Sequence, residues 1–105
     1  MPDPQRISPF LPRTIDEALE TLLEKMDLKA RTKLGRMTEK DLIYLHPDLG
    51  AYIRDRFELS LGNVALMNSC RKTAGKDLDA DSASFLIIRK LWEKLKLTYS
   101  LRVVE

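Results

Sequence analysis

Apolar residues spaced at intervals of three and four are the feature that most restricts the fold of this chain. Such spacing recurs in successive segments between residues 15 and 95, and no segment before residue 97 shows a sustained two-residue alternation. Intervals of three and four place apolar side chains on one side of a helix, whereas alternation would place them on one face of a strand. We therefore expect an all-α fold, an irregular bundle of about five or six short helices.

The first helix is predicted at residues 15–26. Thr14 and Glu17 have the spacing of a capping box, and acidic residues in a first turn are favoured by the helix dipole. One apolar stripe follows, formed by Ile15, Ala18, Leu19, Leu22, Leu23 and Met26. The stripe predicts that one side of this helix packs on the core.

Two shorter helices are expected between residues 27 and 46. Asp27 can cap the first, and Gly35 can end it in the left-handed conformation that glycine adopts readily. The second opens at Thr38 and should stop before Pro47, because proline disfavours helical geometry in the residue that precedes it.

The second half of the chain predicts three more helices, at about residues 49–57, 64–72 and 82–95. Asp48 can cap the first of them and Asn63 the second, while Asp81 or Ser82 can cap the last. The last helix carries the widest apolar stripe, so we expect it to be central to the core. Trp92, the only tryptophan, lies in this stripe and should be buried.

The two ends of the chain differ from the middle. Four of the five prolines fall within residues 1–12, which predicts an extended arm at residues 1–13 before a single helical domain at residues 14–97. The tail at residues 98–105 alternates apolar and polar residues, which predicts a short C-terminal strand. A strand needs a partner for its backbone groups, and that partner would be either the arm or the same tail of a second copy, which would make a homodimer. A frayed end without regular structure is the alternative.

Composition excludes several classes of protein. The chain of 105 residues is 44% hydrophobic and 32% charged with a net charge of +2, a balance typical of globular domains and not of disordered chains. No uninterrupted apolar run is longer than that from Phe85 to Ile88, which is far shorter than the ~20 residues that span a bilayer. With one cysteine and no secretory signal, we expect a cytoplasmic protein that does not engage membranes.

Two blocks of residues form an ordered pattern between residues 45 and 95. The first block contains His46, Leu49, Gly50, Ile53, Arg54, Phe57, Leu59, Asn63, Leu66 and Cys70. The second contains Asp81, Ser84, Ile87, Ile88, Leu91, Trp92 and Leu95. Together they resemble a small, mostly bacterial family known only as a domain of unknown function, although Asp55 and Ser60 stand where that family often has asparagine and an aromatic residue. The resemblance implies a helical fold and no particular activity.

Arg54 is the first candidate binding residue. It follows Ile53 on a helix that buries one face, so its guanidinium should lie at the edge of the core, where a carboxylate usually holds an arginine. We expect Asp81 to be that carboxylate, which would make the pair an ion pair between two helices. Two alternatives remain open: an anion site at Arg54, or an enzyme whose cleft gathers His46, Arg54 and Asp81.

His46 is the only histidine, so no second imidazole is present to share a metal ion. A hydrolase would need His46 beside Cys70, and nothing in their spacing requires the two side chains to meet. A structural histidine is the expectation.

Asp77, Asp79 and Asp81 imitate the start of a calcium-binding loop. The pattern then fails, because Ser82 replaces the glycine at the sixth position and Ile88 replaces the bidentate glutamate at the twelfth. We expect loop carboxylates and a helix cap here, and neither a metal ion nor another cofactor.

Residues 25–40 include the most basic part of the chain. Lys29, Arg31, Lys33 and Arg36 are uninterrupted by acidic residues and could contact phosphates. The segment has no interleaved aromatic residues on which bases could stack, so nucleic acid is not favoured as a partner.

These observations predict a small, non-enzymatic helical module that binds another macromolecule, a protein in preference to other classes. A nucleic-acid-associated regulator that uses residues 25–40 is the first alternative. An enzyme with a cleft around His46, Arg54 and Asp81 is the second.

Overall fold

The computed structural model describes the backbone of residues 11–104 and the side chains of residues 11–98. Over this part of the chain the regular elements are all helical: α1 (Ile15–Lys25), α2 (Leu28–Gly35), the 3₁₀ helix η2 (Glu39–Leu45), the π-helix η3 (His46–Gly50), α3 (Ala51–Arg56), α4 (Val64–Ala74) and α5 (Ala80–Val104). The prediction of an all-α fold is confirmed. The predicted arm falls largely on residues 1–10, which lie outside the described residues.

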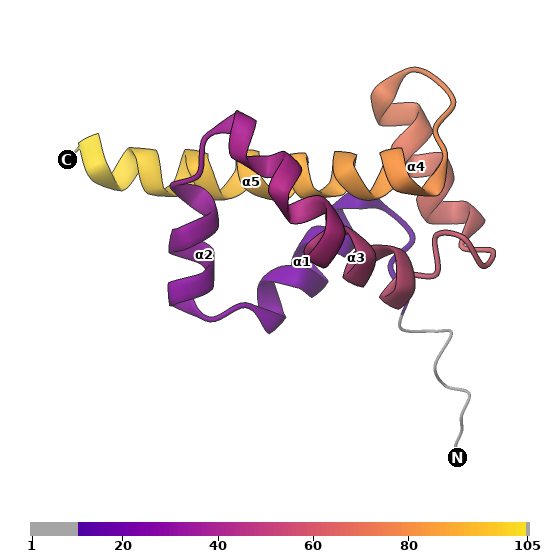
Figure 1. The fold of residues 1–105 in the computed structure, drawn as a ribbon, viewed down its shortest axis with the longest axis horizontal. Coiled ribbons are helices and arrows are strands. Elements are labelled where there is room, and N and C mark those ends of the chain that lie inside the picture. The colour runs from indigo at the N-terminus through magenta and orange to yellow at the C-terminus, as the bar shows by residue number, and fades with distance from the viewer. Residues whose placement is uncertain (1–10, 105) are drawn as a thin grey trace, which may run out of the picture.

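Helix α5 is the central element of the fold. Figure 1 shows it running along the longest axis of the molecule, and every other helix packs against it. Its buried face contributes Ile87, Ile88 and Leu91, whose side chains are fully buried, and they meet core residues such as Leu22 of α1, Ile53 of α3 and Leu66 of α4. The expected central position of the last helix is therefore confirmed.

The helix starts follow from short polar side chains. Thr14, Asp27 and Asn63 each accept a hydrogen bond from a backbone N–H in the first turn of the helix they precede, as predicted. Thr38 and Asp41 form a reciprocal capping box at the start of η2. At α1 the box is altered, because the carboxylate of Glu17 accepts from the backbone N–H of Arg13.

The expected break before Pro47 is wrong. The chain passes from η2 through η3 into α3 without leaving helical geometry, and His46 has φ −59° and ψ −44°. Pro47 lies in the first turn of the π-helical segment. Backbone N–H groups in a first turn have no hydrogen-bond partner within the helix, so the missing N–H of proline costs little stability there. One continuous helical run with changing pitch therefore replaces the two separate helices that were expected.

The predicted C-terminal strand is also wrong. Residues 98–104 belong to α5, which continues to Val104. A helix satisfies its backbone groups within the segment, whereas an isolated strand would leave them without partners. Because residues 98–104 are helical, the argument for a homodimer formed by pairing of two C-terminal strands no longer applies.

Two helix ends differ in detail from the expectation. Gly35 stays within α2, and Arg36 ends the helix in right-handed geometry. The cap of α5 is Asp79, whose carboxylate accepts from the backbone N–H of Ser82 at 2.8 Å, in place of Asp81 or Ser82. None of the described helices is both long enough and apolar enough to cross a membrane.

Candidate functional site

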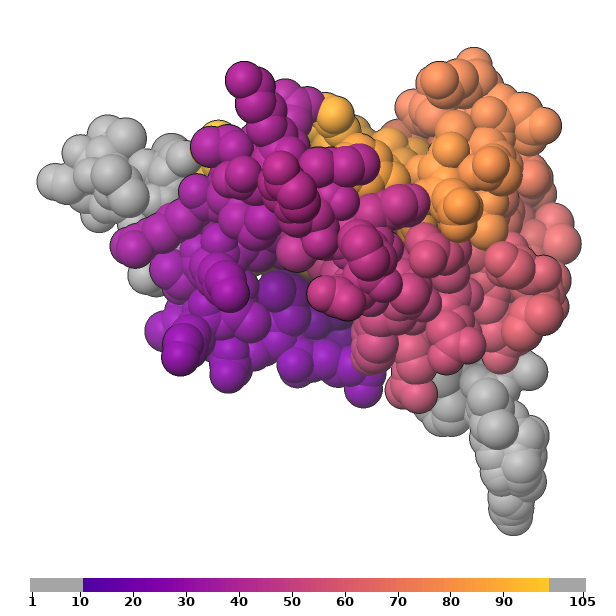
Figure 2. All heavy atoms as spheres, viewed as in Figure 1, coloured from indigo at the N-terminus to yellow at the C-terminus, as the bar shows by residue number. Residues whose placement is uncertain are grey.

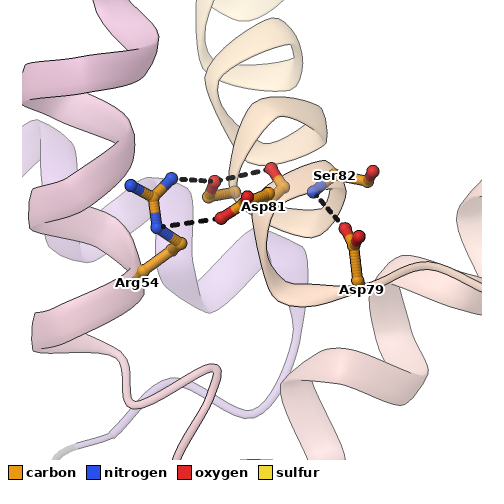
Figure 3. Close-up of polar contacts among 5 residues, drawn as sticks. Arg54, Asp79, Asp81 and Ser82 are labelled. Carbon is orange, nitrogen blue, oxygen red and sulfur yellow. Dashed lines mark hydrogen bonds and ion pairs between the residues drawn. The ribbon is translucent and has the colours of Figure 1, made fainter.

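Arg54 and Asp81 form the predicted ion pair between α3 and α5. Arg54 Nε lies 3.3 Å from Asp81 Oδ1, and Arg54 Nη1 donates to Ser84 Oγ at 3.1 Å. Ser84 in turn donates its hydroxyl proton to the backbone carbonyl of Asp81 at 2.7 Å. Figure 3 shows the guanidinium reaching from α3 to the first turn of α5. The side chain of Arg54 is 24% exposed and that of Asp81 is 69% exposed, so the pair lies at the edge of the core.

The absence of a side chain at Gly50 allows both His46 and Arg54 to approach its backbone closely. A Cβ atom at Gly50 would lie 3.1 Å from both His46 Nδ1 and Arg54 Nη1, and 3.7 Å from Ser84 Oγ. These three polar atoms therefore converge on the bare backbone of one glycine in the π-helical turn. The imidazole of His46 packs edge-on against Phe85, and its Nδ1 atom is buried without a hydrogen-bond partner among the described atoms.

The structure thus brings His46, Arg54 and Asp81 into one neighbourhood, but the depression that His46 and Asp81 share is not lined by Arg54. His46 and Asp81 line a small depression of about 280 Å³ together with Ile43, Ser82 and Phe85, and Arg54 is not part of its lining. A nucleophile of the serine type needs its hydroxyl hydrogen-bonded to a base. Ser84 is fully buried and gives its proton to a backbone carbonyl, so this arrangement holds two helices together.

The three aspartates of the calcium-like pattern have separate roles. Asp77 pairs with Arg71 Nε at 2.7 Å, Asp79 caps α5, and Asp81 holds Arg54. Hydrogen bonds from the backbone and side chain of Ser82 lower the pKa of Asp79. Within the described part of the chain, no three metal-ligating side chains of the His, Cys, Asp and Glu types lie close enough to share an ion.

Cys70 is a core residue of α4 with no exposed surface. Burial raises the pKa of its thiol to about 11, with a smaller opposing effect from the charge of Arg71. The thiol is therefore protonated at neutral pH, whereas the thiolate is the reactive form. This environment disfavours a hydrolase that uses His46 and Cys70.

The four basic residues of the 29–36 segment divide between two sides of α2. Lys29, Lys33 and Arg36 line one groove. Arg31 points the other way and donates from Nη2 to the backbone carbonyl of Leu23, near the end of α1. Residues at i, i+4 and i+7 share a helix side and residue i+2 does not, so this division could have been read from the spacing.

The α2 groove is a surface feature of about 780 Å³, lined by Leu28, Lys29, Thr32, Lys33, Arg36, Met37 and Asp41. Leu28 is 67% exposed, and Met37 is half-buried. In Figure 2 the violet segment that carries α2 and η2 lies at the surface of the molecule. Three of the lining residues, Leu28, Thr32 and Met37, were not singled out from the sequence, because each is unremarkable without the groove around it.

The charges of the α2 groove are mostly of one sign. It contains three basic side chains and one acidic side chain, Asp41, whose carboxylate accepts from both the hydroxyl and the backbone N–H of Thr38. Ion pairs between described side chains engage Arg54, Arg71, Arg89 and Lys90, and none of them engages the three cations of the groove.

A second pocket, of about 550 Å³, lies between α1 and α3. Its charged lining residues are of both signs: Glu24, Lys25, Asp55, Arg56 and Glu58. A mixed lining favours no particular charge on a ligand. The α2 groove therefore carries the clearer chemical preference.

Comparison with known proteins gives a family and no relative of known activity. No curated protein and no solved structure matches the chain. The pattern that defines a domain of unknown function, DUF6794, matches residues 11–95, which include α1 to α4 and most of α5. The match covers most of the chain, and the protein therefore belongs to the DUF6794 family.

Proposed function

We propose that the protein is a non-enzymatic module that binds another protein through the α2 groove. The observation that carries this proposal is the exposure of Leu28, at 67%, on a groove that also contains Met37 and three basic side chains. Exposed apolar side chains are in contact with water in the unbound protein. When a partner covers them, the removal of this surface from water stabilises the complex. Charged groups around them add specificity and increase the rate of association.

The nucleic-acid alternative is less well supported by the same groove. Three phosphate contacts would give a weak, strongly salt-dependent interaction, and the described residues of the groove lining include no aromatic side chain for base stacking. A phosphate backbone would also leave the apolar side chains of Leu28 and Met37 uncovered. Both features favour a protein partner.

The enzyme alternative depends on His46, Arg54 and Asp81. Arg54 already has polar partners in Asp81 and Ser84, and the adjacent depression is small and has no lining from Arg54. These contacts favour a structural role for the three residues. We propose the cytoplasm as the site of action, because one buried cysteine requires no oxidising compartment.

Site-specific photo-crosslinking tests the proposed function. A photoreactive amino acid at Thr32, in the groove, should form an adduct with a defined polypeptide in an extract of cells that produce the protein. That polypeptide, once identified and purified, should bind the unmodified protein. Leu28→Glu should weaken this binding at least tenfold, because it places a charge on the apolar part of the groove.

Leu61→Glu is the matched control. Leu61 is 75% exposed, comparable with Leu28, and lies in the loop between α3 and α4. Binding that survives Leu61→Glu and fails with Leu28→Glu supports the proposal. The absence of an adduct, or an equal loss of binding in the two variants, would overturn it.

A further inference from the structure

We infer that the α2 groove binds an acidic, amphipathic helix of the partner protein. This inference rests on the proposed function and names the chemistry of the segment that the groove recognises. It follows from the order of the basic and apolar side chains along α2, and from the kinds of peptide segment that this surface can accept.

The basic side chains form a row along α2. Lys29, Lys33 and Arg36 are separated by four and three residues, so they follow one side of the helix over about 10 Å. A partner helix that lies along this row can present carboxylates at the same intervals. Each carboxylate then meets a cation without any change of backbone conformation.

Leu28, Met37 and the methyl group of Thr32 form a second, largely apolar row beside the basic one. Leu28 and Thr32 are one helical turn apart on α2, and Met37 continues the lining beyond the end of the helix. A partner must therefore place apolar side chains next to its carboxylates. A helix with leucine-type residues on one stripe and acidic residues on the adjacent stripe meets both requirements.

Other modes of peptide recognition fit this surface less well. Addition of a strand requires a sheet edge, and the described residues form helices without a strand. Recognition of a proline-rich segment requires an aromatic-lined groove, and the lining residues whose side chains the structure describes include no aromatic one. The insertion of a helix into the groove is the mode that its side chains support.

The negative charge of Asp41 restricts how the acidic helix of the partner can be oriented in the groove. Among the described lining residues Asp41 is the acidic one, and it follows Met37 in the chain as part of η2. An acidic stripe that extended past Arg36 towards Asp41 would meet a like charge. The acidic stripe of the partner should therefore end at the level of Arg36, and apolar or basic residues should face Asp41.

A displayed library of single helices of about 15 residues, randomised on one face, provides the test. Selection is carried out in parallel against the natural protein and against the triple variant K29E/K33E/R36E. The natural protein should enrich Asp and Glu at intervals of three and four beside Leu, Met or Phe. The triple variant should enrich Lys and Arg at the same positions, and circular dichroism should confirm that it is folded.

Binding of one selected acidic peptide then isolates the contribution of single residues. Fluorescence anisotropy should show that Lys33→Gln weakens binding by roughly 1.5- to 5-fold, the range of one exposed ion pair. Lys72→Gln, an exposed change on α4, should leave it unaltered. Leu28→Glu should weaken binding more than Lys33→Gln does.

Two results of the selection would overturn the inference. The natural protein could enrich uncharged helices, or the natural protein and the triple variant could enrich the same acidic helices. A 20-base-pair DNA duplex that binds more tightly than the selected peptides, and through Lys33, would also overturn it and favour the nucleic-acid alternative. A photo-crosslinked partner whose contact segment is not acidic would refute this inference and leave the proposed function intact. The absence of a crosslinked adduct at Thr32 would instead refute the proposed function.

Discussion

The indole Nε1 of Trp92 donates a hydrogen bond to the backbone carbonyl of Met37, with a distance of 2.8 Å. Trp92 is 8% exposed and belongs to the core face of α5, whereas Met37 lines the α2 groove. This bond connects the core to the segment between α2 and η2. Residues 55 positions apart are thereby joined, and one residue of the groove lining is anchored to the core by its backbone.

Replacement of Trp92 tests this connection. Trp92→Phe removes the N–H and leaves the Met37 carbonyl without its donor, which should lower the free energy of unfolding by about 1–3 kcal/mol. Trp92→Ala should cost about 3–5 kcal/mol, because it also leaves a cavity. Urea denaturation followed by circular dichroism measures both losses. Tryptophan emission at the water-exposed wavelength in the native protein would contradict the burial on which the expectation rests.

The Arg54–Asp81 pair should contribute modestly to stability. Asp81 is 69% exposed, so solvent screens the pair and a double-mutant cycle should give a coupling of about 0.2–1 kcal/mol. Arg54→Ala should destabilise the protein more than Asp81→Ala, since Arg54 also donates to the fully buried Ser84. Equal effects of the two single changes with no coupling would mean that the contact between α3 and α5 lies elsewhere.

Much of the fold could be predicted because its signals are local. Thr14, Asp27 and Asn63 each begin a helix for a reason that extends over only three residues of sequence. The errors arose where two local preferences compete. Pro47 favours a break, yet packing of η2 and η3 against α5 keeps the chain helical, and the alternation after Leu97 is outweighed by continuation of α5.

The thiol of Cys70 should be almost unreactive in the folded protein. Burial raises its pKa to about 11, so little thiolate forms near neutral pH, and the side chain has no exposed surface. An aromatic disulfide reagent should modify it at least about 100-fold more slowly in buffer than in urea, since reaction requires opening of the core. Similar rates under the two conditions would show that α4 is not packed as described.

Asp79 should make the stability of the protein depend on pH in the acid range. Hydrogen bonds from Ser82 lower its pKa below the ordinary value of 3.8. A lowered pKa in the folded state means that the carboxylate contributes stability above that ordinary value. This contribution is lost as the pH falls through the lowered pKa.

Thermal unfolding of natural protein, Asp79→Ala and Asp79→Asn between about pH 2 and pH 6 checks this expectation. The advantage of the natural protein over Asp79→Ala should shrink at the acid end of the range. Asp79→Asn keeps a capping oxygen without the charge, so its difference from Asp79→Ala should stay constant. A constant difference for the natural protein as well would contradict the assigned cap.

The candidate site was less accessible from the sequence than the fold. The pairing of Arg54 with Asp81 could be predicted, because each residue lies at the edge of a helix that contributes to the core. The α2 groove could not, because it depends on the position of Met37 after the helix ends. The backbone of Met37 is held there in part by a hydrogen bond from Trp92, which lies on a distant part of the chain.

Amide chemical-shift mapping of the labelled protein tests the central claim most directly. Titration with an acidic peptide from the selection should shift the resonances of residues 28–41, and Trp92 Nε1–H should shift with them through its bond to Met37. Shifts of this kind should disappear in Leu28→Glu and persist in Leu61→Glu. Shifts that instead centre on Ile43, His46 and Phe85, or that fail to depend on Leu28, would contradict the assignment of α2 as the binding surface.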